Sequence, residues 1–191
     1  MKGTLILVVG LPGSGKGTLI KHAKQVFPQI AYPVSWTTRP QRPSEINGEV
    51  YHFVSDKEFD DAVAHSEFLE WVEIDNGRKY GTRKKDFVEP LSEGKTVLRE
   101  VEVRGARALI RLLSDSAVVT VFVRAGNWED LRERMRSRAP MGEEELAARK
   151  ARYEEEMHFV EEADYVLENE FGKLEETKQK FEKLIRAIIK S

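Results

Sequence analysis

The sequence has no cysteine among its 191 residues, which excludes disulfide bonds and thiolate metal sites and favours a reducing compartment. Long apolar runs are missing too: none approaches the roughly 20 residues that span a bilayer, and the run at 5–9 is too short for a signal peptide. A net charge of −2 does not indicate a nucleic-acid or membrane partner. The four histidines lack metal-ligand spacing. We therefore expect a soluble, cytoplasmic protein.

Strand-like and helix-like segments alternate along the chain. Apolar runs at 4–9, 96–101, 118–123 and 165–167 are each followed by a segment with helical apolar spacing. This alternation indicates a mostly parallel sheet with helices on both faces. Two segments break the rhythm, and both are candidate inserted flaps. Residues 35–85 suggest short strands around one helix, with a capping box at 55–58 and a hairpin turn at 75–77; residues 132 to about 162 suggest two helical arms.

The strongest motif is a glycine-rich turn, Gly10-Leu11-Pro12-Gly13-Ser14-Gly15-Lys16, between a buried strand and an amphipathic helix. Glycines let backbone N–H groups turn inward around phosphate oxygens, and the helix N-terminus attracts the same anion. Lys16 would reach the β- and γ-phosphates. This P-loop predicts ATP binding and does not identify the acceptor. A plain glycine-rich turn is the alternative interpretation.

The residue after the P-loop lysine is normally Ser or Thr, which binds Mg²⁺, and here it is Gly17 with Thr18 next. One residue turns the helix by about 100°, so Thr18 is the candidate metal ligand, through water. The predicted ATP-binding residues are Gly10, Gly13, Ser14, Gly15, Lys16, Gly17 and Thr18.

A second anion site is suggested by Arg39 and Arg42, three residues apart in a stretch punctuated by proline. Guanidinium forks suit phosphate oxygens. An isolated pair of this kind is more often a solvated basic loop, so the surrounding sequence has to decide between the two interpretations.

Several ordered blocks of the chain resemble guanylate kinases from end to end. The blocks are Ser35-x-Thr-Thr-Arg39-x-x-Arg42, Asn47-Gly48-x-x-Tyr51-x-Phe53, Phe68-Leu69-Glu70-Trp71, Tyr80-Gly81-Thr82, Glu100-Val101-Glu102-Val103-x-Gly105, the arginine-rich segment and Glu168-Asn169. The resemblance implies an α/β P-loop kinase fold with a mostly parallel five-stranded sheet flanked by helices. It also implies one domain over 1–191, with the P-loop at 10–18, a GMP-binding insertion at about 35–85 and a helical lid at about 132–155.

The resemblance implies that the protein transfers a phosphoryl group from ATP to GMP with Mg²⁺, as a monomer or homodimer. Arg39, Arg42, Tyr51 and Tyr80 would hold the GMP phosphate. Glu70 would accept hydrogen bonds from guanine N1–H and the 2-amino group, and Ser35 and Thr82 would direct hydroxyls toward O6 and the ring edge. Lys16, Arg134, Arg138 and Arg149 would act in catalysis, and Asn169 would face adenine.

The acidic pair Glu100 and Glu102 is assigned to the GMP site by the same resemblance, although it could organise the metal, Lys16 or the base. Arg99 and Arg104 stand beside this pair, where the resemblance leads us to expect an apolar residue and a glutamine. Taken singly, Glu70 fits a solvated strand residue, and Tyr51 and Tyr80 fit half-buried packing residues.

Two alternative functions remain at this point. One is a P-loop kinase with another acceptor, AMP or a phosphorylated ribose, against which Glu70 argues. The other is a non-catalytic guanylate-kinase-like binding module. Lys16 and the arginines of the predicted lid are present, and both would tend to be lost in such a module.

Overall fold

The computed structural model describes residues 3–11, 13–43, 45–49, 51–74, 77–113, 117–136, 142–170 and 172–190, with the backbone alone for Ile74, Arg134, Met135, Arg152 and Glu155. Arg138 and the hairpin residues Asp75 and Asn76 lie outside the described residues. Within the described residues, no helix is long and apolar enough to span a membrane.

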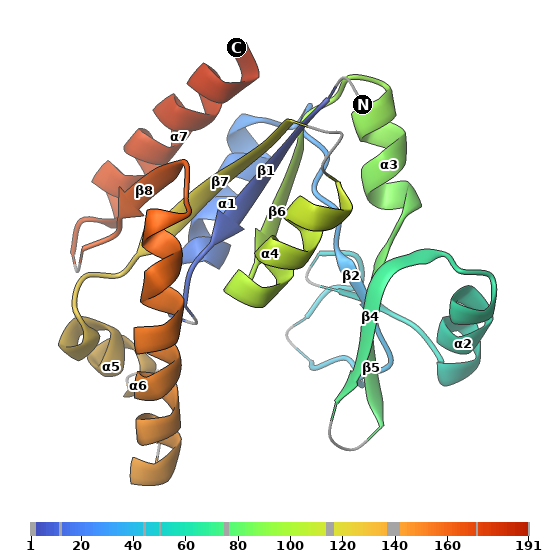
Figure 1. The fold of residues 1–191 in the computed structure, drawn as a ribbon, viewed down its shortest axis with the longest axis horizontal. Coiled ribbons are helices and arrows are strands. Elements are labelled where there is room, and N and C mark those ends of the chain that lie inside the picture. Colours follow the sequence, from blue (N-terminus) through green and yellow to red (C-terminus); the bar gives the residue numbers. More distant parts are fainter. Residues whose placement is uncertain are drawn as a thin grey trace.

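A parallel sheet, here called the core sheet, forms the centre of the molecule (Figure 1). Its strand order is β6 (Val97–Val101), β1 (Thr4–Val9), β7 (Ala117–Arg124) and β8 (Tyr165–Glu168). All three neighbouring pairs run parallel. The carboxyl ends of these strands therefore meet at one edge, which is where parallel sheets place their ligands. The α/β class and the parallel arrangement expected from the sequence are confirmed.

Helices cover both faces of the core sheet, because successive side chains of its buried strands point to opposite sides. On one face, α1 (Lys16–Val26) and α7 (Leu174–Lys190) pack against alternate residues such as Ile6 and Val8. On the other, α3 (Lys85–Ser92), α4 (Val103–Leu112) and the 3₁₀ helix η1 (His158–Glu161) pack against Leu5, Leu7 and Val9. The continuous apolar run of β1 thus contributes buried side chains to two separate hydrophobic cores, one on each face of the sheet.

The expected fifth strand of the core sheet is reduced to a single parallel bridge between Ala31 and Val97 within the described residues. The Ala31 amide donates to the Thr96 carbonyl at 3.0 Å, and the Leu98 amide donates to the Ala31 carbonyl at 2.9 Å. The next donor of such a ladder would be the backbone nitrogen of residue 33. Pro33 has no N–H, so the pairing ends there.

A second sheet, here called the small sheet, is built by the segment that interrupts the strand–helix rhythm. Its order is β3 (Tyr51–Phe53), β2 (Ser35–Thr37), β5 (Arg78–Arg83) and β4 (Phe68–Ile74). The antiparallel β4–β5 pair confirms the predicted hairpin. Helix α2 (Asp56–Ala64) begins at the predicted capping box, in which the Ser55 hydroxyl accepts from the Glu58 amide and the Glu58 carboxylate accepts from the Ser55 amide.

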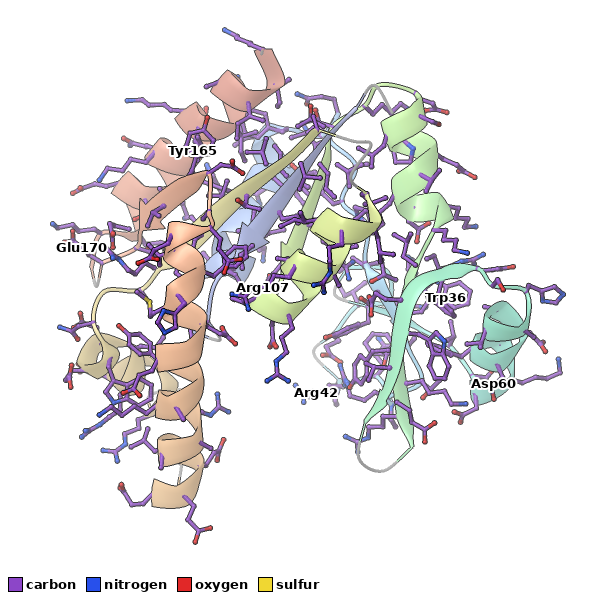
Figure 2. The ribbon with its side chains drawn as sticks, viewed as in Figure 1. Trp36, Arg42, Asp60, Arg107, Tyr165 and Glu170 are labelled. Carbon is purple, nitrogen blue, oxygen red and sulfur yellow. The ribbon has the colours of Figure 1, made fainter. Side chains whose placement is uncertain are left out.

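The small sheet has one apolar and one polar face. Trp36 lies on the α2 side and packs edge-on against Phe68, whose ring stacks on Phe59 of α2, whereas Arg42 lies on the other side (Figure 2). Because β-strand side chains alternate, the register assigns a common polar side to the predicted GMP-site residues of the four strands. These residues are Ser35, Tyr51, Glu70, Tyr80 and Thr82.

Gly81 lies on the apolar face of the small sheet and tests how tightly that face is packed. A Cβ there would lie 2.7 and 2.8 Å from Phe68 ring carbons and 3.0 Å from Phe59. We expect Gly81→Ala to lower the free energy of unfolding by about 1–3 kcal/mol, measured by urea denaturation. The control is Gly105→Ala, whose Cβ would meet Val101 at an ordinary 3.7 Å. Equal stability of wild type and Gly81→Ala would contradict this packing account.

Two further helices, α5 (Trp128–Arg136) and α6 (Glu143–Met157), project from the core on the side opposite the small sheet (Figure 1). The N-terminus of α5 is capped by Asn127, whose side-chain oxygen accepts from the Asp130 amide at 2.9 Å. Leu131 and Leu146 are buried between the two helices, and the Trp128 ring lies 5.5 Å from that of Tyr153. This small core also includes Leu11 of the glycine-rich loop and Ala125, so the helix pair packs against the end of the core sheet.

Candidate active site

The glycine-rich loop follows β1, the second strand of the core sheet, and ends at the first residue of α1. Gly13 and Gly15 have φ angles of 89° and 95°, a region that side chains with a Cβ rarely adopt. Ser14 is fully buried. The backbone therefore curls over the N-terminus of α1, in the conformation that phosphate cradles use.

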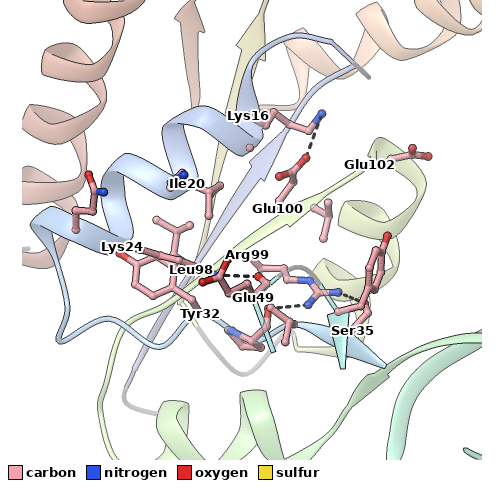
Figure 3. Close-up of a pocket in the computed structure, with 17 residues that line it drawn as sticks. Lys16, Ile20, Lys24, Tyr32, Ser35, Glu49, Leu98, Arg99, Glu100 and Glu102 are labelled. Carbon is pink, nitrogen blue, oxygen red and sulfur yellow. Dashed lines mark hydrogen bonds and ion pairs between the residues drawn. The ribbon is translucent and has the colours of Figure 1, made fainter. Parts of the chain in front are cut away.

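Lys16 is 5% exposed and turns back into this loop. Its ammonium donates to the carbonyls of Gly10 and Leu11 at 2.6 and 2.9 Å. Glu100, at the carboxyl end of β6, lies 3.8 Å from the same nitrogen (Figure 3). Burial lowers the pKa of Lys16, and the nearby carboxylates of Glu100 and Glu102 oppose this shift. The charge thus sits at the centre of the loop.

Position 17 faces the same carboxylate. A Cβ on Gly17 would lie 3.6 Å from a carboxylate oxygen of Glu100, and Gly17 and Thr18 are exposed in the first turn of α1. Mg²⁺ in kinase sites is held largely by substrate phosphates and water, with one or two carboxylates. Glu100 and Thr18 fit that chemistry, although the described residues contain no cluster of three or more acidic or histidine ligands.

Asn169, predicted to face adenine, is 3% exposed and lies beside the loop. Its amide donates to the Ser14 carbonyl at 2.7 Å. A Cβ on Gly15 would come within 2.2 Å of this amide nitrogen, so the side chain and the loop are in direct contact. The contact supports the cradle's shape from the end of β8.

Arg39 lies beneath the rings of the small sheet and is 8% exposed. Its guanidinium donates to both carboxylate oxygens of Glu45, at 2.8 and 3.0 Å, and to the Pro40 carbonyl at 2.8 Å. It lies 5.6 Å from the Tyr51 ring and 5.2 Å from the Phe53 ring. The hydrogen bond with Glu45 raises the pKa of Arg39 and lowers the pKa of the Glu45 carboxyl. Arg39 is therefore a fixed, permanent charge.

Glu45 was not among the residues predicted from the sequence. Besides holding Arg39, it accepts from the Arg42 backbone amide at 2.9 Å, so it shapes the loop that carries both arginines. An acidic residue six positions after Arg39 was the available signal. The pattern alone does not show that the loop folds back far enough to bring the two together.

The polar face of the small sheet gathers the remaining predicted GMP-site residues. Glu70 pairs with Thr82 across β4 and β5, so their side chains are neighbours on one face. The Tyr51 and Tyr80 rings meet at 5.7 Å, and burial raises the pKa of Tyr51. Glu70 is exposed and Thr82 is 2% exposed. Hydroxyls, phenols and a carboxylate thus share one face of the small sheet, on which Arg39 lies against the Tyr51 ring.

A cavity of about 790 Å³ connects the loop to the small sheet (Figure 3). Its lining includes Lys16 and Gly17 at one end, Glu100 and Glu102 in the middle, and Ser35, Tyr51 and Arg99 at the other. Both acidic residues that the sequence left without a single role therefore line the same cavity as Lys16 and Ser35. Glu100 contacts Lys16, whereas Glu102 is exposed at the N-cap of α4.

The predicted lid arginines are only partly placed. Arg149 lies on α6 and donates to Glu145, one turn earlier, at 2.8 and 3.1 Å. Arg134 lies on α5 with its backbone alone described, and Arg138 is outside the described residues. Of the three predicted catalytic arginines of the lid, Arg149 therefore has a described side chain, and an exposed i,i+4 ion pair of this kind contributes little stability.

A positive-φ glycine loop with a buried lysine, set between a strand of a parallel sheet and a helix N-terminus, defines a P-loop protein. The sequence profile of the guanylate kinase family matches residues 2–188. The chain belongs to this family.

Individual relatives agree. The guanylate kinase of Rubrobacter xylanophilus is 38% identical over 188 residues, covering 98% of this chain and 96% of its own. That of a Nostoc species is 38% identical over 170 residues, covering 89% and 84%. The crystal structure of guanylate kinase from Anaplasma phagocytophilum matches with a TM-score of 0.72 at 25% identity, covering 99% of this chain and 87% of that one.

Proposed function

We propose that this protein transfers the γ-phosphoryl group of ATP to GMP, giving ADP and GDP. The observation that carries the proposal is that one continuous cavity runs from the phosphate cradle at Lys16 to the polar face of the small sheet at Ser35 and Tyr51. A phosphoryl transfer between two nucleotides needs two anion sites that open into one space. Family membership supports the same reaction.

On the donor side, the loop's backbone N–H groups and Lys16 would hold the ATP phosphates. Lys16 would exchange its bonds to the carbonyls of Gly10 and Leu11 for phosphate oxygens. Mg²⁺, when bound, would neutralise phosphate charge beside Glu100 and Thr18. The backbone donors around these phosphates would come from the loop and the first turn of α1, at Gly10, Gly13, Ser14, Gly15 and Gly17.

On the acceptor side, Arg39 and Arg42 would hold the GMP phosphate together with the phenols of Tyr51 and Tyr80. An oxygen of that phosphate would attack the γ-phosphorus in line, while the bond to the β–γ bridging oxygen of ATP breaks. Glu70 would accept from guanine N1–H and the 2-amino group. Adenine has no donor at either position, so it would leave this carboxylate unpaired.

The helical lid at about 132–155 would close over the donor. Arg149, with Arg134 and Arg138, would then neutralise charge on the transferring group and exclude water, which limits ATP hydrolysis. In this interpretation residues 35–85 form the GMP-binding insertion of a single domain. A cytoplasmic location and a monomeric or homodimeric state stay predictions.

Glu70 provides the test of the acceptor. We expect Glu70→Gln to lower kcat/KM for GMP by about 10²-fold, since two hydrogen bonds to a charged group are lost, with the KM for ATP unchanged. ADP release is measured in a coupled assay with GMP or AMP. The matched control is Glu73→Gln, which lies three residues along β4 and so on the other face of the small sheet. Wild-type turnover of AMP with none of GMP would overturn the assignment of GMP as acceptor.

A further inference from the structure

Arg99 connects the two sheets. It belongs to β6 of the core sheet, and its guanidinium donates to the Pro33 carbonyl at 2.7 Å and to the Ser35 hydroxyl at 2.5 Å (Figure 3). It also donates to the Thr82 hydroxyl at 3.3 Å. One terminal nitrogen serves both hydroxyls, which come from β2 and β5 of the small sheet. The Phe87 ring lies 5.8 Å away.

The Arg99 charge is unusual for its surroundings. Among the described residues it has no carboxylate within ion-pair distance, and its buried Nε has no hydrogen-bond partner. Burial lowers the pKa of Arg99, opposed first by the attraction of Glu70, and an arginine keeps its proton nonetheless. A buried cation without a carboxylate disfavours folding relative to an apolar side chain, and an apolar residue is what the family resemblance leads us to expect here.

The hydrogen-bond directions at this site are fixed by chemistry. A guanidinium has five N–H donors and no acceptor. The hydroxyls of Ser35 and Thr82 therefore accept from Arg99 and cannot donate back to it. Neither hydroxyl has another hydrogen-bond partner in the part of the chain that the structure describes. Each hydroxyl can therefore donate its proton to an acceptor other than Arg99. Ser35 lines the cavity, where a ligand could provide that acceptor.

We propose that Arg99 is a positioning residue that makes Ser35 and Thr82 act as hydrogen-bond donors toward the acceptor base, and thereby selects a 6-oxo purine over a 6-amino purine. Guanine presents acceptors at O6 and N7, whereas adenine presents an amino donor at position 6. A free hydroxyl can meet either group by rotating its proton. A hydroxyl that already accepts from Arg99 has its proton available to donate, so it forms a better hydrogen bond with the guanine carbonyl than with the adenine amino group. The inference rests on the proposed function.

The test compares GMP, IMP and AMP as acceptors for wild type and Arg99→Met. IMP keeps the 6-oxo group and lacks the 2-amino group, so it separates reading at position 6 from reading at position 2. We expect kcat/KM to fall about tenfold for both GMP and IMP, through KM, with the GMP-to-IMP ratio, the activity with AMP and the KM for ATP unchanged. Arg111→Met, on the exposed end of α4, is the control for charge loss.

A double-mutant cycle separates action through the hydroxyls from a general effect on the fold. In a Ser35→Ala/Thr82→Val background, adding Arg99→Met should change the ratio of GMP to AMP activity less than twofold. A full tenfold effect in that background would overturn the inference, as would unchanged selectivity in Arg99→Met alone. If Arg99→Met does not fold, Arg99→Lys, which keeps a donor, must retain the wild-type selectivity. Absence of GMP turnover by the wild type would instead overturn the proposed function itself.

Discussion

Lys16→Met is expected to lower kcat by about 10³-fold or more. The side chain supplies the charge at the centre of the P-loop, and removal of one charged group that stabilises a transferring phosphoryl costs on this order. Methionine keeps most of the volume in a site that is 5% exposed, so no large cavity forms. ADP release at saturating ATP and GMP measures the change.

The fold should survive this substitution. Burial lowers the pKa of Lys16 below that of the unfolded chain, so between the two pKa values the unfolded state binds more protons and stability rises with pH. At neutral pH the buried ammonium of Lys16 therefore lowers the free energy of unfolding, and methionine removes this destabilisation. Thermal unfolding should show no loss, and Lys180→Met, on an exposed position of α7, should match wild type in activity. Retained turnover in Lys16→Met would refute the assignment of the cradle.

Arg39→Lys is expected to lower kcat/KM for GMP by about 10²-fold while the KM for ATP stays constant. The fork of Arg39 is fixed by Glu45 and by the carbonyl of Pro40, and lysine replaces it with a single flexible point charge. Loss of a charge-assisted, bidentate contact to a phosphate is worth a few kcal/mol. Initial rates at varied GMP measure the effect.

The control for Arg39→Lys is Arg186→Lys. Arg186 is also held by a glutamate, Glu182, but it lies on α7. It should leave both KM values at wild-type levels. An equal rise of the KM for ATP in Arg39→Lys would place Arg39 outside the acceptor site.

Local patterns predicted most of the elements. The uninterrupted apolar run at 4–9 is β1, because a strand buried on both faces has no polar side. The capping box at Ser55 and the glycine-rich turn also follow from short-range chemistry. Each of these features is determined by residues that are close together in the sequence.

Features that depend on residues far apart in the chain could not be predicted from the sequence. The pairing of Ala31 with Val97 ends at Pro33, which matters only once the two segments are adjacent. The contact of Asn169 with Ser14 spans 155 positions, and that of Arg99 with Ser35 spans 64. Arg99 is unusual in the sequence, yet its partners Pro33, Ser35 and Thr82 are set by the three-dimensional fold.

The two faces of the small sheet have different roles: one packs against α2, and the other presents polar side chains. Phe59 and Phe68 hold the sheet to α2 from one side, while Ser35 and Thr82 stand on the other with hydroxyls bonded only to Arg99 among the described residues. Substitutions on the second side leave cohesion on the first intact. An ancestral chain could therefore have changed the nucleobase it accepts by single steps without passing through an unfolded intermediate.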